Sequence, residues 1–271
     1  MSIPTKIQHF IFKASLQIEK RIRFVLGSLV MSFLMLVSTF FFFDKAIFFI
    51  PIFILTAYMV TYFAVLQGIE KVEWLTLFLM PVLLTVAFYL FYLLFPVRWL
   101  TRVPFILVYA FSLYALLLTS NIFNVGAEKS LQLYRAAFSV NYFYHTFIVF
   151  LTASVIFSFR MNPLFNGLLI FFTAFSLSAQ LLWSTKPQIY LEKAVIVHSF
   201  LIGLVLFQVT ILLSFVPIRL PIFALFITAT YYSLCGLVYH YSEQKLFINT
   251  IREYLIVIGF VSLIAFLSLQ W

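Results

Sequence analysis

The sequence is poor in cysteine, in glycine and in charged residues. The single cysteine, Cys235, excludes an intrachain disulfide and a metal site built from several cysteines. The glycines, seven in all with no two of them four positions apart, exclude close helix packing through GxxxG motifs. Charged residues make up 9% of the chain and apolar residues 65%, whereas charged residues make up about 25% of a typical globular domain. A water-soluble fold could not bury that much apolar surface, so we expect lipid to surround most of the chain.

Catalytic and nucleotide-binding motifs are also missing. The chain has no H-E-x-x-H metalloprotease motif, no G-x-S-x-G nucleophile elbow and no Walker-type phosphate loop. The middle of each apolar run contains no aspartate or lysine, which are the usual marks of ion-coupled transport. The sequence leaves enzymatic activity undecided and favours a non-catalytic protein. We predict no cofactor and no metal site.

Apolar runs of membrane-span length alternate with charge, proline or glycine along the chain. Because a helix needs about 20 apolar residues to cross a bilayer, these runs predict an all-α, polytopic transmembrane helical bundle. Nine spans fit best, with eight or ten as alternatives, and the first is too long for a signal-peptide core. The predicted spans cover residues 24–43, 46–66, 75–95, 104–124, 137–159, 163–183, 192–216, 220–240 and 254–271.

Residues 1–22 differ from the spans that follow them. Ile3, Ile7 and Ile11 recur at helical spacing, while lysine and glutamine side chains occupy the other faces. This pattern is typical of a basic amphipathic helix that lies in the anionic inner surface of a membrane. We therefore predict an interfacial helix over residues 1–22 and a single transmembrane domain over residues 23–271.

The lysines and arginines predict the orientation. With the N-terminus in the cytoplasm, 12 of the 17 basic residues lie on the inner side, and five lie outside: Lys45, Arg98, Arg102, Arg160 and Arg219. The positive-inside rule then predicts a multi-pass protein of the cell membrane with a cytoplasmic N-terminus and an external C-terminus. The basic residues stand between apolar runs, as membrane anchors do. We therefore expect the lipid bilayer as partner, other membrane subunits as an open alternative, and no nucleic acid.

Short similar segments occur at two predicted inner boundaries. Gly68-Ile69-Glu70-Lys71 is followed 58 residues later by Gly126-Ala127-Glu128-Lys129. The pattern favours helix hairpins repeated in parallel. The competing explanation is that any protein with short loops needs a turn at each end of a span.

Polar side chains within or beside the spans are the candidates for a functional site. Because polar groups are costly against lipid, they should face the interior of the bundle. The spacing i, i+3, i+7 places Asn121, Asn124 and Glu128 on one helical face. The predicted substrate- or cavity-lining residues are Asn121, Asn124, Glu128, Asn141, His145, His198 and Gln208.

These polar residues allow three interpretations. They can join helices by hydrogen bonds, they can line a substrate or proton pathway, or two of His145, His198 and His240 can ligate a haem. We favour a non-catalytic membrane scaffold or complex subunit. The alternative is a transporter or binder of a small or amphipathic solute, acting through a cytoplasm-facing cavity between spans four and eight.

Two stretches resemble an uncharacterised multi-pass membrane family of small-genome bacteria of the candidate phyla radiation. They are Ser120-Asn121-Ile122-Phe123-Asn124-Val125-Gly126-Ala127-Glu128-Lys129-Ser130-Leu131-Gln132-Leu133-Tyr134-Arg135 and Leu246-Phe247-Ile248-Asn249-Thr250-Ile251-Arg252-Glu253-Tyr254-Leu255. The resemblance implies a bacterial inner-membrane setting. It implies no activity.

Overall fold

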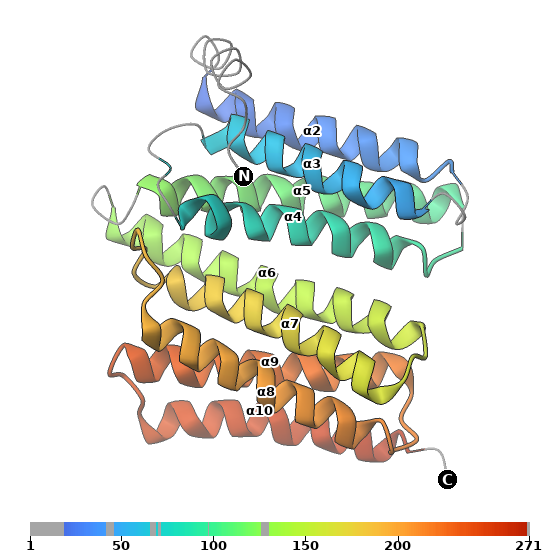
Figure 1. The fold of residues 1–271 in the computed structure, drawn as a ribbon, viewed down its shortest axis with the longest axis vertical. Coiled ribbons are helices and arrows are strands. Elements are labelled where there is room, and N and C mark those ends of the chain that lie inside the picture. Colours follow the sequence, from blue (N-terminus) through green and yellow to red (C-terminus); the bar gives the residue numbers. More distant parts are fainter. Residues whose placement is uncertain are drawn as a thin grey trace. The chain divides into compact units, whose positions relative to one another are not determined.

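The computed structural model describes residues 19–41, 46–65, 69, 72–96, 98–125 and 130–269. Within these residues the chain forms nine α-helices and no strand (Figure 1). The helices are α2 (Lys20–Ser38), α3 (Ala46–Val65), α4 (Glu73–Tyr92), α5 (Trp99–Val125), α6 (Leu131–Ser158), α7 (Pro163–Trp183), α8 (Lys193–Leu213), α9 (Leu220–Ser242) and α10 (Ile248–Leu267). All nine of these helices are long and apolar enough to cross a membrane. The predicted all-α membrane bundle with nine spans is confirmed.

Several helices extend beyond the predicted spans. α5 begins at Trp99, before the predicted start at 104, and α6 begins at Leu131, before 137. The apolar run marks only the segment that hydrocarbon surrounds, whereas the helix can continue where water satisfies the backbone. Residues 1–18 of the predicted interfacial helix lie outside the described residues, and its last residues, 20–22, belong to α2. Of the two similar segments, only Ile69 is described.

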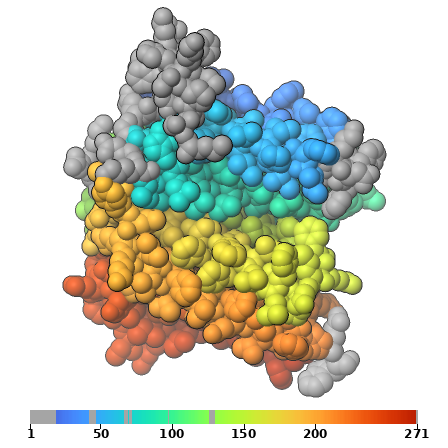
Figure 2. Space-filling model, in the orientation of Figure 1, coloured from blue at the N-terminus to red at the C-terminus, as the bar shows by residue number. Residues whose placement is uncertain are grey.

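The chain divides into two compact units, Met1–Asn141 and Tyr142–Trp271. In the first unit α2 packs against α3 and α5, and α4 lies against the same two helices. Figure 2 shows side chains filling the spaces that Figure 1 leaves between the ribbons of α3 and α4. In the second unit α7 packs along α8, α8 against α9, and α9 against α10. A single transmembrane domain over residues 23–271 stays a prediction.

Two buried arginines join helix ends within the first unit. Arg23, in the first turn of α2, is 4% exposed and donates from a guanidinium nitrogen to the carbonyl of Phe63 at 3.3 Å, near the end of α3. Arg102, in the first turn of α5, donates to the carbonyl of Thr39 at 3.1 Å, at the end of α2. The C-terminal end of a helix carries a partial negative charge, so a cation there is favourable. These contacts hold neighbouring antiparallel helices in register.

In the contact between α7 and α8, a glycine of each helix faces a phenylalanine of the other. A Cβ atom at Gly167 would lie 2.9 Å from the ring of Phe207, and one at Gly203 would lie 3.1 Å from the ring of Phe171. Each helix therefore places a phenylalanine over the glycine of the other. This close approach fixes the α7–α8 hairpin, whose turn at residues 184–192 forms part of the site described below.

Candidate functional site

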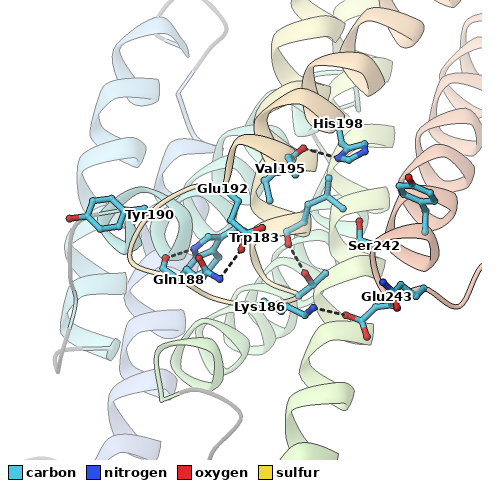
Figure 3. Close-up of a pocket in the computed structure, with 14 residues that line it drawn as sticks. Trp183, Lys186, Gln188, Tyr190, Glu192, Val195, His198, Ser242 and Glu243 are labelled. Carbon is cyan, nitrogen blue, oxygen red and sulfur yellow. Dashed lines mark hydrogen bonds and ion pairs between the residues drawn. The ribbon is translucent and has the colours of Figure 1, made fainter.

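A cavity of about 470 Å³ opens in the second unit where α7 and α9 end and α8 begins (Figure 3). Its walls come from the last residues of α7, the α7–α8 turn, the first turns of α8 and the end of α9. Small-molecule pockets usually enclose about 300–1,000 Å³. We call this cavity the α7–α8–α9 pocket and treat it as the candidate functional site.

The turn that borders the pocket is held by hydrogen bonds to the end of α7. The hydroxyl groups of Ser184 and Thr185 donate to the carbonyls of Leu181 and Leu182, each at 2.8 Å. Such bonds satisfy carbonyl groups that the helix end leaves without partners. The indole nitrogen of Trp183, a residue only 2% exposed, donates to the carbonyl of Gln188 at 2.9 Å and closes the turn.

We expect Trp183→Phe to loosen this turn without unfolding the unit. The substitution keeps most of the buried ring and removes one hydrogen bond, which contributes roughly 1 kcal/mol net. Amide hydrogen exchange across residues 184–192 should therefore become about fivefold faster, because local opening becomes that much more populated. Trp99→Phe, in the other unit, is the control. Equal exchange in both variants would show that the indole bond does not hold the turn.

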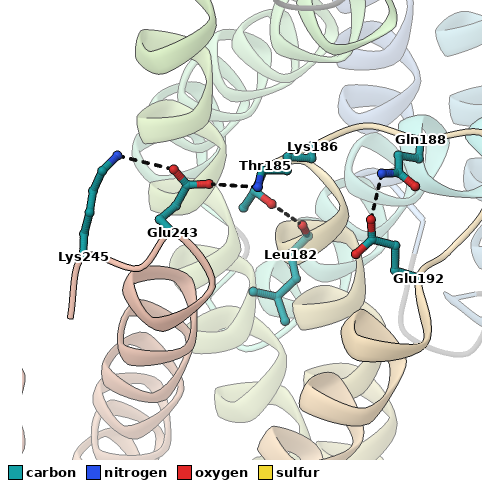
Figure 4. Close-up of polar contacts among 7 residues, drawn as sticks. All are labelled: Leu182, Thr185, Lys186, Gln188, Glu192, Glu243 and Lys245. Atoms are coloured by element: carbon teal, nitrogen blue, oxygen red, sulfur yellow. Dashed lines mark hydrogen bonds and ion pairs between the residues drawn. The ribbon is translucent and has the colours of Figure 1, made fainter.

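Glu192 supplies the carboxylate at the start of α8. It occupies the N-cap position, but its side chain makes no capping hydrogen bond. One carboxylate oxygen instead accepts from the side-chain nitrogen of Gln188 at 2.7 Å (Figure 4). Within the part of the chain that the structure describes, no basic side chain forms an ion pair with Glu192. The positive end of the α8 dipole favours the negative charge there.

Glu243, directly after α9, lies between two lysines. The Lys245 ammonium is 3.4 Å from one of its carboxylate oxygens, and the Lys186 ammonium is 4.0 Å from the other. The Lys186 side chain is 71% exposed. Exposed ion pairs contribute only about 0–1 kcal/mol. The contact between Lys186 and Glu243 is therefore easily exchanged for another partner.

His198 contributes an imidazole to the pocket from the second turn of α8. Its Nδ1 lies 2.7 Å from the carbonyl oxygen of Ala194, and its ring packs edge-on against Tyr241 with centroids 6.1 Å apart. Because a carbonyl oxygen only accepts, Nδ1 carries a proton. Nε2 therefore accepts a hydrogen bond when the ring is neutral and donates one when it is protonated.

Among the predicted lining residues that the structure describes, only His198 lines the pocket. Asn141 and His145 are buried in α6. Asn121 and Asn124 are half-buried near the end of α5, and Gln208 is exposed on α8. Glu128 lies outside the described residues. A cavity lined by all of these residues stays a prediction.

The charged residues of the pocket were not among the predicted lining residues. Lys186, Glu192 and Glu243 lie outside the predicted spans or at their edges, where we interpreted the basic residues as membrane anchors. A signal was present. Lys186 and Glu192 share one short turn that begins directly after a tryptophan and contains glutamine, a composition richer in polar groups than a connecting turn needs.

The three histidines proposed as haem ligands have different surroundings. His145 is fully buried in α6, His198 lines the pocket, and His240 lies near the end of α9 with its ring 6.1 Å from that of Tyr254. Over the described residues, no group of three or more His, Cys, Asp or Glu side chains is arranged to hold a metal ion. Haem ligation by a pair of these histidines stays a prediction.

Comparison with known proteins places the chain in a family. No curated protein and no solved structure matches it. One family model matches residues 47–268, a range that runs from α3 to α10 and covers most of the chain. That family is described as a protein of unknown function, in agreement with the resemblance to an uncharacterised membrane family. The chain, a membrane-embedded protein with nine apolar helices in its described part, therefore belongs to the DUF5656 family.

Proposed function

We propose that the protein binds a small or amphipathic solute in the α7–α8–α9 pocket. The observation that carries this proposal is a cavity of about 470 Å³ whose wall includes Lys186, Glu192, His198 and Glu243. Cavities left by imperfect packing are apolar and stay empty, whereas polar cavities hold water or a ligand. Charged side chains converging on one space at a helix boundary therefore favour a binding role.

A structural role explains the polar groups deeper in the spans. The hydroxyl groups of Thr61, Ser178 and Thr228 each donate to a carbonyl one turn earlier in their own helix, at 2.7–2.8 Å. Such bonds leave those hydroxyls no free donor for a solute. The second candidate function is a membrane scaffold or complex subunit, in which these hydroxyls serve only their own helices. The pocket supports solute binding as the first candidate, because a scaffold has no need of it.

The proposed setting follows from the charge distribution. With the N-terminus in the cytoplasm, the α7–α8 turn and the end of α9 lie on the cytoplasmic side, together with Lys186 and Lys245. The pocket would then open to the cytoplasm. We place the protein in the inner membrane of a bacterium, on the strength of the resemblance to a family of the candidate phyla radiation.

Extraction of the purified protein tests solute binding. Ser242→Trp places a large side chain in the pocket wall, and Ser214→Trp places the same side chain in a smaller cavity at the opposite ends of α7, α8 and α9. We expect wild type and Ser214→Trp to release about one equivalent of a small molecule, detected by mass spectrometry. Ser242→Trp should release less than about a tenth of that amount, since a filled pocket excludes its ligand.

Both variants must first match the wild type in size-exclusion profile and thermal midpoint. A wild-type extract without a stoichiometric small molecule would contradict the proposal. So would an extract that Ser242→Trp leaves unchanged, and the scaffold role would then be the better account.

A further inference from the structure

We propose that the solute is a zwitterion, which carries an ammonium group and an anionic group at opposite ends. This inference rests on the proposed function and specifies its ligand. The pocket wall carries two carboxylates, Glu192 and Glu243, and one ammonium group, Lys186, while Lys245, which lies outside the wall, pairs with Glu243. A purely anionic ligand would meet the carboxylates of Glu192 and Glu243, and a purely cationic one would meet the ammonium group of Lys186. A ligand with one charge of each sign avoids both conflicts.

Glu192 is the negative pole. One of its oxygens accepts from Gln188 at 2.7 Å, and no basic side chain pairs with it among the described residues. An ionised carboxylate has about four acceptor positions, so most remain available to a ligand. A ligand ammonium would place up to three donors beside it. Such charge-assisted hydrogen bonds are roughly twice as strong as neutral ones.

Lys186 is the positive pole. Its ammonium is 4.0 Å from Glu243, whereas Lys245 approaches the same carboxylate more closely, at 3.4 Å. If Lys186 turns toward a ligand anion, Glu243 therefore keeps a partner and is not left as an uncompensated charge. The exposed side chain of Lys186 has the freedom to make this exchange. His198 adds a second group whose Nε2 donates to an anion when protonated.

The two poles lie at opposite ends of the α7–α8 turn and have different partners. Figure 4 shows the contact between Gln188 and Glu192 and the contact between Lys186 and Glu243 as separate pairs. Glu192 ends the α7–α8 turn, at the N-cap of α8, and Lys186 lies near the start of the same turn, shortly after α7. A ligand that bridges them must therefore carry its charges on separate groups, as a phosphoethanolamine moiety does.

A membrane lipid and a free metabolite can both present this chemistry. The pocket lies where three apolar helices end, and Trp183, Tyr190 and Tyr241 line it. Tryptophan and tyrosine are enriched at the depth of lipid headgroups. A lipid headgroup could therefore reach the pocket from the bilayer, while a free zwitterion would enter from water.

Thermal stabilisation of the full-length protein in detergent tests the inference. The probes are dihexanoyl phosphatidylethanolamine, free phosphoethanolamine and, as the anionic comparison, dihexanoyl phosphatidylglycerol. We expect the ethanolamine probes to raise the thermal midpoint in a saturable manner, because a ligand that binds only the folded state stabilises it. The glycerol lipid should have no saturable effect.

Substitutions at each pole make the test specific. Glu192→Gln and Lys186→Gln should each weaken the apparent affinity for the ethanolamine probe about tenfold, the loss expected for one charge-assisted hydrogen bond. Arg252→Gln and Glu253→Gln change the same kinds of charge on exposed positions of α10 and serve as matched controls. Both controls should bind like the wild type.

The outcomes distinguish failure of the zwitterion proposal from failure of the solute-binding proposal. Stabilisation by both ethanolamine probes shows that the headgroup suffices, and stabilisation by the lipid form alone identifies a membrane source. Binding of phosphatidylglycerol that depends on Lys186 but not on Glu192 would overturn the zwitterion and keep the solute-binding role. No stabilisation by any probe would also overturn the zwitterion. The solute-binding role itself is contradicted only by the extraction experiment, if the wild type releases no small molecule or if Ser242→Trp does not reduce its amount.

Discussion

Replacing Gly236 by alanine is expected to separate α10 from α9. A Cβ atom at this position would overlap the ring and hydroxyl group of Tyr254. Tyr254 has little room to move, because its ring lies against those of Tyr232 and His240, with centroids 5.6 and 6.1 Å away. Overpacking a well-packed contact typically costs about 1–3 kcal/mol. We expect a loss at the upper end of that range, because Tyr254 is one of the few buried side chains of α10.

The thermal midpoint of the purified protein measures this loss. Gly259→Ala is the matched control, since a Cβ atom there meets nothing within 4 Å. The control should be neutral or slightly stabilising, because alanine favours helix over glycine by about 1 kcal/mol. The double variant Gly236→Ala with Tyr254→Ala should be less destabilised than the sum of its single changes. Equal midpoints for the two glycine variants would disprove the tight contact.

Arg102→Ala is expected to destabilise the first unit by about 3 kcal/mol, because it removes two hydrogen bonds from a charged group, each of which contributes about 1.5–3 kcal/mol. The Arg102 side chain is 9% exposed and donates to the Tyr92 hydroxyl at 3.3 Å and to the carbonyl of Thr39 at 3.1 Å. Its guanidinium also lies 4.7 Å from the ring centroid of Phe40 and 5.4 Å from that of Trp99. One side chain thus connects α2, α4 and α5.

Helicity followed by circular dichroism during SDS titration in mixed micelles measures the change. Arg98→Ala is the control, because Arg98 is exposed one turn earlier and carries the same charge. Arg102→Lys should fall between the two, since an ammonium group lacks the planar fork that reaches both acceptors. If Arg102→Ala and Arg98→Ala unfold at the same SDS fraction, the buried guanidinium contributes nothing to the packing of these helices.

The sequence predicted the helices well and their ends less well. Each span was visible because about 20 consecutive apolar residues have few alternatives to a membrane helix. The early starts of α5 and α6 were not visible, because residues such as Trp99 and Leu131 lie beside polar positions. There the helix continues by backbone hydrogen bonding, which hydropathy does not report.

The candidate site was predictable only in part. His198 was identified because a histidine in an apolar run is costly and calls for an explanation. Lys186 and Glu243 were not, because each is an ordinary charge at the end of a span when seen alone. These two residues become candidates only because they lie close together in the structure. No periodicity in the sequence relates the turn after α7 to the end of α9.

Composition by itself determined that the protein is a bundle of membrane helices. In hydrocarbon each backbone amide must find its partner within the same segment, and only the helix achieves this for a single span. Tertiary structure alone decided which polar groups converge. The close Gly–Phe contacts between α7 and α8 and the docking of α9 beside them bring Lys186, Glu192 and Glu243 to one cavity. Such convergence depends on side-chain shapes across helices, which the order of residues along one helix does not encode.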